Sequence, residues 1–255
     1  MMQAAESGGI PFALPRVPPA QRARAATIFE ALRERYPDAR CALDYSSAHE
    51  LLVATILSAQ ATDVGVNKAT PALFAKFPTP EAFARATPAE LEPYVRSLGF
   101  FRNKARAIHE AMKAVHERFG GEVPRSMAEL LTLRGVARKT ANVVLSNAFG
   151  INEGVVVDTH VERLAKRLGL VPARTSVPMI ERRLMALLPR EQWGLLSHLL
   201  IFHGRQVCKA RGGFCATDSI CRRFCSNAKA APARRPRVKS ARRVKPAAKR
   251  ARARR

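Results

Sequence analysis

The sequence is poor in acidic residues. It has 20 aspartates and glutamates against 44 lysines and arginines among its 255 residues, which gives a formal net charge of +24. So much self-repulsion favours a polyanionic partner, with nucleic acid as the first candidate and an anionic membrane surface as the second. Thirteen of the positive charges lie in residues 227–255, which contain no acidic residue and too few apolar ones for a core. We expect this segment to be a disordered basic tail that binds phosphates without sequence preference.

Long hydrophobic runs are also missing. The longest apolar candidates, 51–57 and 195–202, are much shorter than the ~20 residues that a membrane span needs. The N-terminal residues lack the cationic start and apolar stretch of a secretory signal. The sequence therefore predicts a cytoplasmic protein with no membrane partner.

No segment shows the alternation of apolar and polar residues that is typical of strands. The chain is 47% hydrophobic, which is enough for one large domain or two compact ones, and its apolar spacing is helical. Pro71 argues against the continuity of one expected helix, and residues 1–20, with four prolines, are expected to be a disordered lead. The prediction is an all-α fold with helices over 21–36, 48–59, 63–77, 103–119, 126–132, 138–149, 160–168, 176–188 and 191–206.

Cysteine is scarce as well. Of the five cysteines, Cys41 stands alone and is expected to be a small buried apolar residue. A chain of this length does not need disulfides to support its core, so a metal or cluster site is the better interpretation of the others. Four cysteines can hold either an iron–sulfur cluster or a tetrahedral zinc ion. The candidate ligands are Cys208, Cys215, Cys221 and Cys225.

Residues 130–145 predict a helix, a tight turn at Gly135 and a second helix. The free backbone N–H groups and the dipole at the start of the second helix form a site for a DNA phosphate that needs no base contact. Lys139 lies in the first turn of that helix, where the dipole and Arg138 favour the neutral amine, which is a nucleophile. The alternative is that Lys139 only contacts phosphate.

Residues 155–157 are three valines that run into another helix. Thr159 and Glu162 match a capping box, so Asp158 is expected to lie just before the helix cap. A carboxylate beside three valines is partly desolvated, which suits proton transfer. The alternative is that Asp158 merely assists the start of the helix.

Several of these segments, taken together, resemble bacterial endonuclease III over roughly residues 21–226. The resemblance implies a helix-hairpin-helix glycosylase fold and a monomer. It also implies a helical-barrel domain over 41–155, an iron–sulfur domain made of 21–40 and 156–226, and a DNA cleft between them. The matching segments are 57–63, 66–70, 135–136, 138–145, 157–160 and 203–205.

The resemblance further implies a base-excision repair enzyme that acts on oxidised pyrimidines in damaged double-stranded DNA. Lys139 would attack C1′ of a flipped-out nucleotide, Asp158 would assist, and the resulting Schiff base would permit β-elimination. Gln60 would fill the space that the flipped-out base leaves in the base stack. Phe100 would be an apolar wedge between bases, unless it is a core residue. The DNA-contacting residues implied are Gln60, Phe100, Gly135, Val136, Ala137, Arg138, Thr140 and His160.

The hairpin departs from the family pattern at two positions. Arg134 stands where the family has a proline, and Ala137 where it has a second glycine. If that glycine serves a positive φ or a close approach to phosphate, Ala137 weakens the DNA contact. Arg134 would then compensate with its charge.

The cysteine spacing also departs from the family. The chain has C-x6-C-x5-C-x3-C instead of the usual C-x6-C-x2-C-x5-C, and Asp218 stands where the third cysteine is expected. Four thiolates remain, so the resemblance favours a 4Fe–4S cluster, with zinc as the alternative.

Three further functions stay open. The chain could be a paralogue that acts mainly as a lyase at abasic sites, or a glycosylase for another lesion. The basic tail and the altered hairpin would also suit a non-catalytic DNA-binding protein, although Lys139 and Asp158 are both present.

Overall fold

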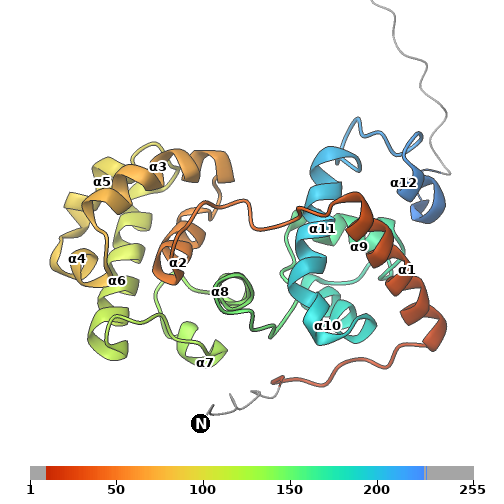
Figure 1. Ribbon diagram of the computed structural model, residues 1–255, viewed down its shortest axis with the longest axis horizontal. Coiled ribbons are helices and arrows are strands. Elements are labelled where there is room, and N and C mark those ends of the chain that lie inside the picture. The colour runs from red at the N-terminus through yellow and green to blue at the C-terminus, as the bar shows by residue number, and fades with distance from the viewer. Residues whose placement is uncertain (1–9, 227, 229–255) are drawn as a thin grey trace, which may run out of the picture.

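The computed structural model describes residues 10–226 and 228, and within these the regular elements are all helical. This confirms the all-α prediction. Figure 1 shows two groups of helices side by side, with α8 near their boundary. None of the described helices is long and apolar enough to cross a membrane.

The first group surrounds a hydrophobic cluster that runs in sequence from Leu43 to Leu145. Its long helix α6 packs against α2, α4 and α5, and α8 packs against α2. The helices of this group are α2 (Ala48–Leu57), α3 (Asp63–Lys76), α4 (Pro80–Arg85), α5 (Pro88–Val95), α6 (Phe101–Phe119), α7 (Met127–Leu130) and α8 (Arg138–Phe149).

The second group surrounds a cluster drawn from both ends of the described chain, residues 17–36 and 155–225. Its N-terminal helix packs against α10, α11 and α12. The chain therefore passes between the two clusters twice, before α2 and after α8. The elements of this group are α1 (Pro19–Arg35), α9 (Thr159–Arg167), α10 (Val177–Leu187), the 3-10 turn η1 (Arg190–Gln192), α11 (Trp193–Gln206) and α12 (Ser219–Phe224).

Proline accounts for most of the differences from the expected helices. Pro80 and Pro88 begin α4 and α5, two helices that the sequence interpretation had treated as connections. Proline is well tolerated at the first helical position, because the N–H group that it lacks would have no partner there. Pro71 lies inside α3 without ending it, so the expected interruption does not occur. The short helix α12 was not expected either.

The N-terminal lead is ordered over much of its length. Val17 is buried in the second cluster, and Ile10, Phe12 and Leu14 pack against it, so the prediction of disorder is wrong for residues 10–20. These four apolar side chains are spaced two or three residues apart, a pattern that proline content alone obscured. The rest of the lead, residues 1–9, and the basic tail at 227 and 229–255 lie outside the described residues.

Candidate active site

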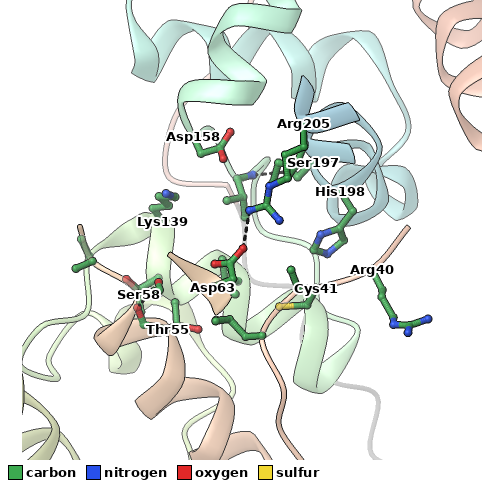
Figure 2. Close-up of a pocket in the computed structure, with 18 of the residues that line it drawn as sticks. Arg40, Cys41, Thr55, Ser58, Asp63, Lys139, Asp158, Ser197, His198 and Arg205 are labelled. Atoms are coloured by element: carbon green, nitrogen blue, oxygen red, sulfur yellow. Dashed lines mark hydrogen bonds and ion pairs between the residues drawn. The ribbon is translucent and has the colours of Figure 1, made fainter. Parts of the chain in front are cut away.

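A pocket of about 410 Å³ lies between the two helix groups. Its walls come from the C-terminal end of α2, the start of α8, the residues before α9 and the middle of α11 (Figure 2). Six of the residues expected to act on DNA line it. These are Gln60, Gly135, Ala137, Lys139, Thr140 and Asp158.

The hairpin turn before α8 requires a glycine at one position. Gly135 has a φ of +78°, and a Cβ there would lie 3.3 Å from side-chain atoms of Ala107 and Ile56. Ala137, by contrast, is the N-cap residue of α8 with a φ of −96°. The concern that Ala137 replaces a glycine of positive φ therefore does not apply, since any residue adopts this conformation.

Arg134 has a different role from the one expected. Its Nη1 donates to both carboxylate oxygens of Glu110, at 2.9 and 2.8 Å. The charge of Arg134 is thus paired with that of Glu110 on α6, and both side chains are exposed. The ion pair ties the hairpin turn to α6, at the position where the family has a proline.

Lys139 is the second residue of α8 and is exposed at the pocket. Among the described residues, no hydrogen bond or ion pair engages its amine. The first N–H groups of a helix have no intrahelical partner and point out of its N-terminal end, so they and the dipole surround the amine with positive potential. An amine in this setting, without an anionic partner, is suited to act as a nucleophile.

Asp158 caps α9, contrary to the capping box expected at Thr159. Its Oδ1 accepts a hydrogen bond of 2.7 Å from the backbone N–H of Val161, and Thr159 is the first helical residue. The preceding segment is anchored by the backbone N–H of Val156, which donates to Ser197 Oγ at 3.0 Å. Asp158 also lines the pocket, so one carboxyl group both caps a helix and faces the cavity beside Lys139 (Figure 2).

Three of the residues expected to contact DNA make contacts within the protein. Val136 is buried in the first cluster and its N–H donates to Leu133 O. The guanidinium of Arg138 bonds to Glu181 and to a backbone carbonyl. His160 Nδ1 lies 3.1 Å from Arg163 Nη2, and burial, above all, lowers the pKa of His160.

Gln60 and Phe100 share an unusual backbone conformation. Their φ values are +53° and +57°, the only positive ones at non-glycine positions among the described residues. Phe100 is 65% exposed and precedes α6, so the core alternative for this residue is wrong. Strained backbone at exposed residues beside a cleft is common where side chains must project toward a ligand.

The sequence did not predict that Cys41, Asp63, His198 and Arg205 line the pocket. Arg205 on α11 donates to the carboxylate of Asp63 on α3 at 2.5 Å, which joins the two helix groups across the cavity. His198 Nε2 bonds to Asn147 Oδ1 at 2.8 Å, and burial lowers the pKa of His198 to about 4, so its ring is neutral at pH 7. Cys41 packs against the first cluster as expected but also lines the pocket. Asp63 and Arg205 belong to motifs already singled out, but no pattern indicated that they pair.

The four C-terminal cysteines converge beside the C-terminal end of α11. The Sγ atoms of Cys208, Cys215 and Cys221 lie within 4.8 Å of one another, and the Cys225 thiol contacts those of Cys208 and Cys221. Hydrogen bonding from Cys221 and Cys225 lowers the pKa of the Cys208 thiol to about 4. All but Cys215 are buried.

The altered cysteine spacing has a structural explanation. Asp218, at the position where the third cysteine is expected, caps α12 by accepting the backbone N–H of Cys221 at 2.9 Å. The cap starts a helical turn that brings Cys221 to the other thiols. Two N–H donors reach the sulfurs, Arg167 Nη1 to Cys208 at 3.4 Å and His203 Nε2 to Cys221 at 3.3 Å.

The chain matches known proteins over most of its length. Residues 53–190 match the family model of the HhH-GPD superfamily base excision DNA repair proteins. The chain is 51% identical to endonuclease III of Synechocystis sp. over 210 residues, covering 82% of this chain and 95% of the relative. It is 39% identical to endonuclease III of Escherichia coli, covering 78% and 95%. The chain belongs to the endonuclease III family.

Solved structures agree with this assignment. A trapped endonuclease III–DNA covalent intermediate matches with a TM-score of 0.77 at 42% identity, covering 82% of this chain and 97% of that one. A thermostable thymine-DNA glycosylase, 20% identical, shares the fold with a TM-score of 0.74. The activity of this endonuclease III family member is therefore that of a base-excision DNA glycosylase and lyase, and the non-catalytic alternative is wrong.

Asp158 provides a charge at the pocket and a cap for α9, and two substitutions should separate the effects of losing each. Asp158→Asn keeps an oxygen for the Val161 N–H, so the free energy of unfolding should stay close to wild type, while the rate of DNA cleavage under single-turnover conditions falls about 10²–10⁴-fold. Asp158→Ala should also lose about 1 kcal/mol of stability. Denaturant unfolding and single-turnover kinetics measure the two effects.

A matched control is Thr79→Ala, which removes the side-chain cap of α4 far from the pocket. It should lower stability to a similar extent and leave the rate unchanged. A wild-type rate in Asp158→Asn would contradict a role for the carboxylate in the reaction.

Proposed function

We propose that this protein excises oxidised pyrimidines from duplex DNA and cleaves the strand at the resulting abasic site through a Schiff base on Lys139. The observation that carries the proposal is the shared pocket, in which an unpartnered amine at a helix N-terminus and the carboxylate of Asp158 come from different helix groups. A related endonuclease III has been trapped covalently on DNA, which supports the same chemistry here.

The proposed reaction begins with attack of the neutral Lys139 amine on C1′ of the flipped-out nucleotide. The bond between C1′ and the base breaks, and the base leaves with the electron pair and gains a proton. Asp158 takes up the proton that the amine loses, or stabilises positive charge on the sugar as it develops. The C1′–O4′ bond of the sugar then breaks, O4′ leaves with the electron pair and gains a proton, and the lysine nitrogen becomes doubly bonded to C1′ as an iminium.

The iminium then permits strand cleavage. It withdraws electrons from the neighbouring carbon, so a base can remove a proton from C2′ and the 3′ phosphate leaves with its electron pair. Water adds to C1′ and releases the amine. The same lysine thus supports both base removal and β-elimination, with no step that requires an oxidant or a reductant.

DNA contacts would come from the start of α8 and from two exposed turns. The free N–H groups of Ala137, Arg138 and Lys139 at the start of α8 suit a phosphate of the damaged strand. Gln60 and Phe100 lie at exposed turns, where Gln60 would fill the vacated stack and the ring of Phe100 would wedge between bases. Both side chains would stabilise a nucleotide that has left the helix, because extrusion costs a few kcal/mol.

Borohydride trapping tests the role of Lys139. Wild-type protein, incubated with duplex DNA that holds an abasic site or thymine glycol, should form a covalent adduct after reduction of the Schiff base. Lys139→Ala should form none, because no other amine occupies the start of α8. Gel electrophoresis measures the adduct.

The control variant is Lys113→Ala, which removes an exposed amine on α6 that pairs with Glu117. It should form the adduct at the wild-type rate. An adduct that persists in Lys139→Ala, or no adduct with wild-type protein on either DNA, would contradict the proposal.

The cysteine site fits a 4Fe–4S cluster. Its donors are four convergent thiols, and Arg167 and His203 supply the N–H groups that commonly bond cluster sulfurs. Cys208, Cys215, Cys221 and Cys225 would hold the group. A bound cluster supplies a redox-active centre and a cross-link between the end of α11 and α12.

Absorbance distinguishes this cluster from zinc. Freshly purified protein should show a broad band near ~400 nm, with iron and sulfide in the proportions of a 4Fe–4S cluster. Cys225→Ser should weaken the band, because it removes one thiolate ligand. No such band, with one zinc per chain by elemental analysis, would overturn the cluster and favour the tetrahedral zinc site.

A further inference from the structure

Arg138, the residue before Lys139, is held by three groups behind the pocket. Its Nε donates to Glu181 Oε1 at 3.0 Å and its Nη2 to the carbonyl oxygen of Glu153 at 2.9 Å. Its guanidinium lies over the ring of Phe12, 5.0 Å from the ring centroid. Arg138 begins α8, so these contacts fix the first turn of the helix that carries Lys139.

Glu181 holds two positions on one face of α8. Its Oε1 accepts from Arg138 and, at 3.2 Å, from Asn142 Nδ2. Residues four apart lie on the same face of a helix, so a single carboxylate on α10 accepts hydrogen bonds from two successive turns of α8. The Glu181 side chain is only 14% exposed, which strengthens a charged hydrogen bond.

The site around this carboxylate leaves no room for another side chain. A Cβ at Gly154 would collide with Glu181 Oε1 and would approach Asn142 Nδ2 to 2.5 Å. The backbone between α8 and α9 therefore passes directly over the Arg138–Glu181 contact. This connection joins α8, which carries Lys139, to Asp158 at the start of α9, so the positions of both side chains depend on it.

Phe12 lies between arginines from the two helix groups. Arg138 on α8 is over its ring at 5.0 Å, and Arg182 on α10 is over it at 4.3 Å. The segment that carries Phe12, residues 10–18, runs from α1 past α10 toward the boundary between the groups (Figure 1). We call this segment the N-terminal strap.

We propose that Phe12 of the N-terminal strap and Glu181 are positioning residues, which hold Arg138 so that Lys139 faces the reacting sugar beside Asp158. The inference rests on the proposed role of Lys139. Consecutive helical residues project roughly 100° apart, so a guanidinium fixed behind α8 sets the direction in which the next side chain enters the pocket. A cation over an aromatic ring also offsets the repulsion between the two arginines.

A separate contact holds the opposite end of α8. There, Asn147 Oδ1 accepts a hydrogen bond from His198 on α11, a contact between neutral groups about two turns from Lys139. It fixes the C-terminal end of α8 against the second helix group. The Arg138 contacts supply the corresponding constraint at the catalytic end.

The test is single-turnover cleavage of abasic duplex DNA by full-length protein at saturating concentration, with DNA affinity measured separately. Phe12→Leu keeps an apolar side chain but removes the ring, and Glu181→Ala removes the carboxylate. Each should lower the rate about tenfold or more, because small displacements of a nucleophile are costly, while the DNA Kd stays within about twofold. The double variant should lose less than the product of the two effects, since both act through Arg138.

Two controls separate positioning from stability. Phe12→Tyr keeps the ring and should restore the wild-type rate. Phe119→Leu removes another ring that lies under an arginine, Arg118 at 5.1 Å on α6, and should leave the rate unchanged. Thermal unfolding shows whether each variant is folded at the assay temperature. Should Glu181→Ala fail to fold, Phe12→Leu still decides the question.

The outcomes distinguish this inference from the proposed function. A wild-type rate in Phe12→Leu, or an equal loss in Phe119→Leu, would overturn the positioning role alone. Loss of DNA affinity with an unchanged saturating rate would also overturn it, because it would make Phe12 a binding residue. Borohydride trapping with wild-type protein is run beside these assays, and no adduct there would overturn the proposed function itself.

Discussion

The attachment of α8 to the second helix group is the constraint on which the rest of the structure depends. Ala141, Val144 and Leu145 bury one face of α8 in the first cluster, whereas Arg138 and Asn147 bond to α10 and α11. Lys139 therefore belongs by packing to one group and is oriented by the other. Asp158 is held on the second group by its own helix cap. The proposed reaction needs both side chains in one pocket, and the relative position of the two helix groups brings them there.

The hairpin before α8 differs from the family pattern at Arg134 and Ala137. Arg134, at the position where the family has a proline, pairs with Glu110 on α6. Gly135 keeps the positive φ that the turn needs, and Ala137 adopts an ordinary N-cap conformation. The free N–H groups at the start of α8 are retained, so these departures leave the proposed phosphate site in place.

Local patterns in the sequence were sufficient to predict most helices. The bounds of α8 agree with those expected, because its apolar residues recur at helical spacing and Gly150 ends it. The helices α4 and α5 were missed because each is short and begins with proline. Asp158 and Thr159 are both good caps, and the choice between them depends on backbone dihedral angles that sequence does not determine.

Contacts between residues far apart in sequence could not be predicted. Asp63 pairs with Arg205, 142 residues away, and Phe12 meets Arg138 and Arg182 through a segment that composition indicated to be disordered. The resemblance to endonuclease III implies a DNA contact for Arg138. Its partner Glu181 is 43 residues away, and only the packing of the two helix groups shows that the guanidinium is already engaged.

The central claim is that the amine of Lys139 forms the covalent bond to DNA. Peptide mapping by mass spectrometry of the borohydride-reduced adduct tests it most directly, after nuclease treatment and digestion with trypsin. Trypsin does not cleave after a modified lysine, so the adduct should appear on residues 139–163, a peptide that contains one lysine, Lys139, and also Asp158. The account predicts the mass of the reduced sugar remnant on this peptide, with fragment ions that place it at Lys139. The remnant on any other peptide, or on the amine of the N-terminus, would contradict the account.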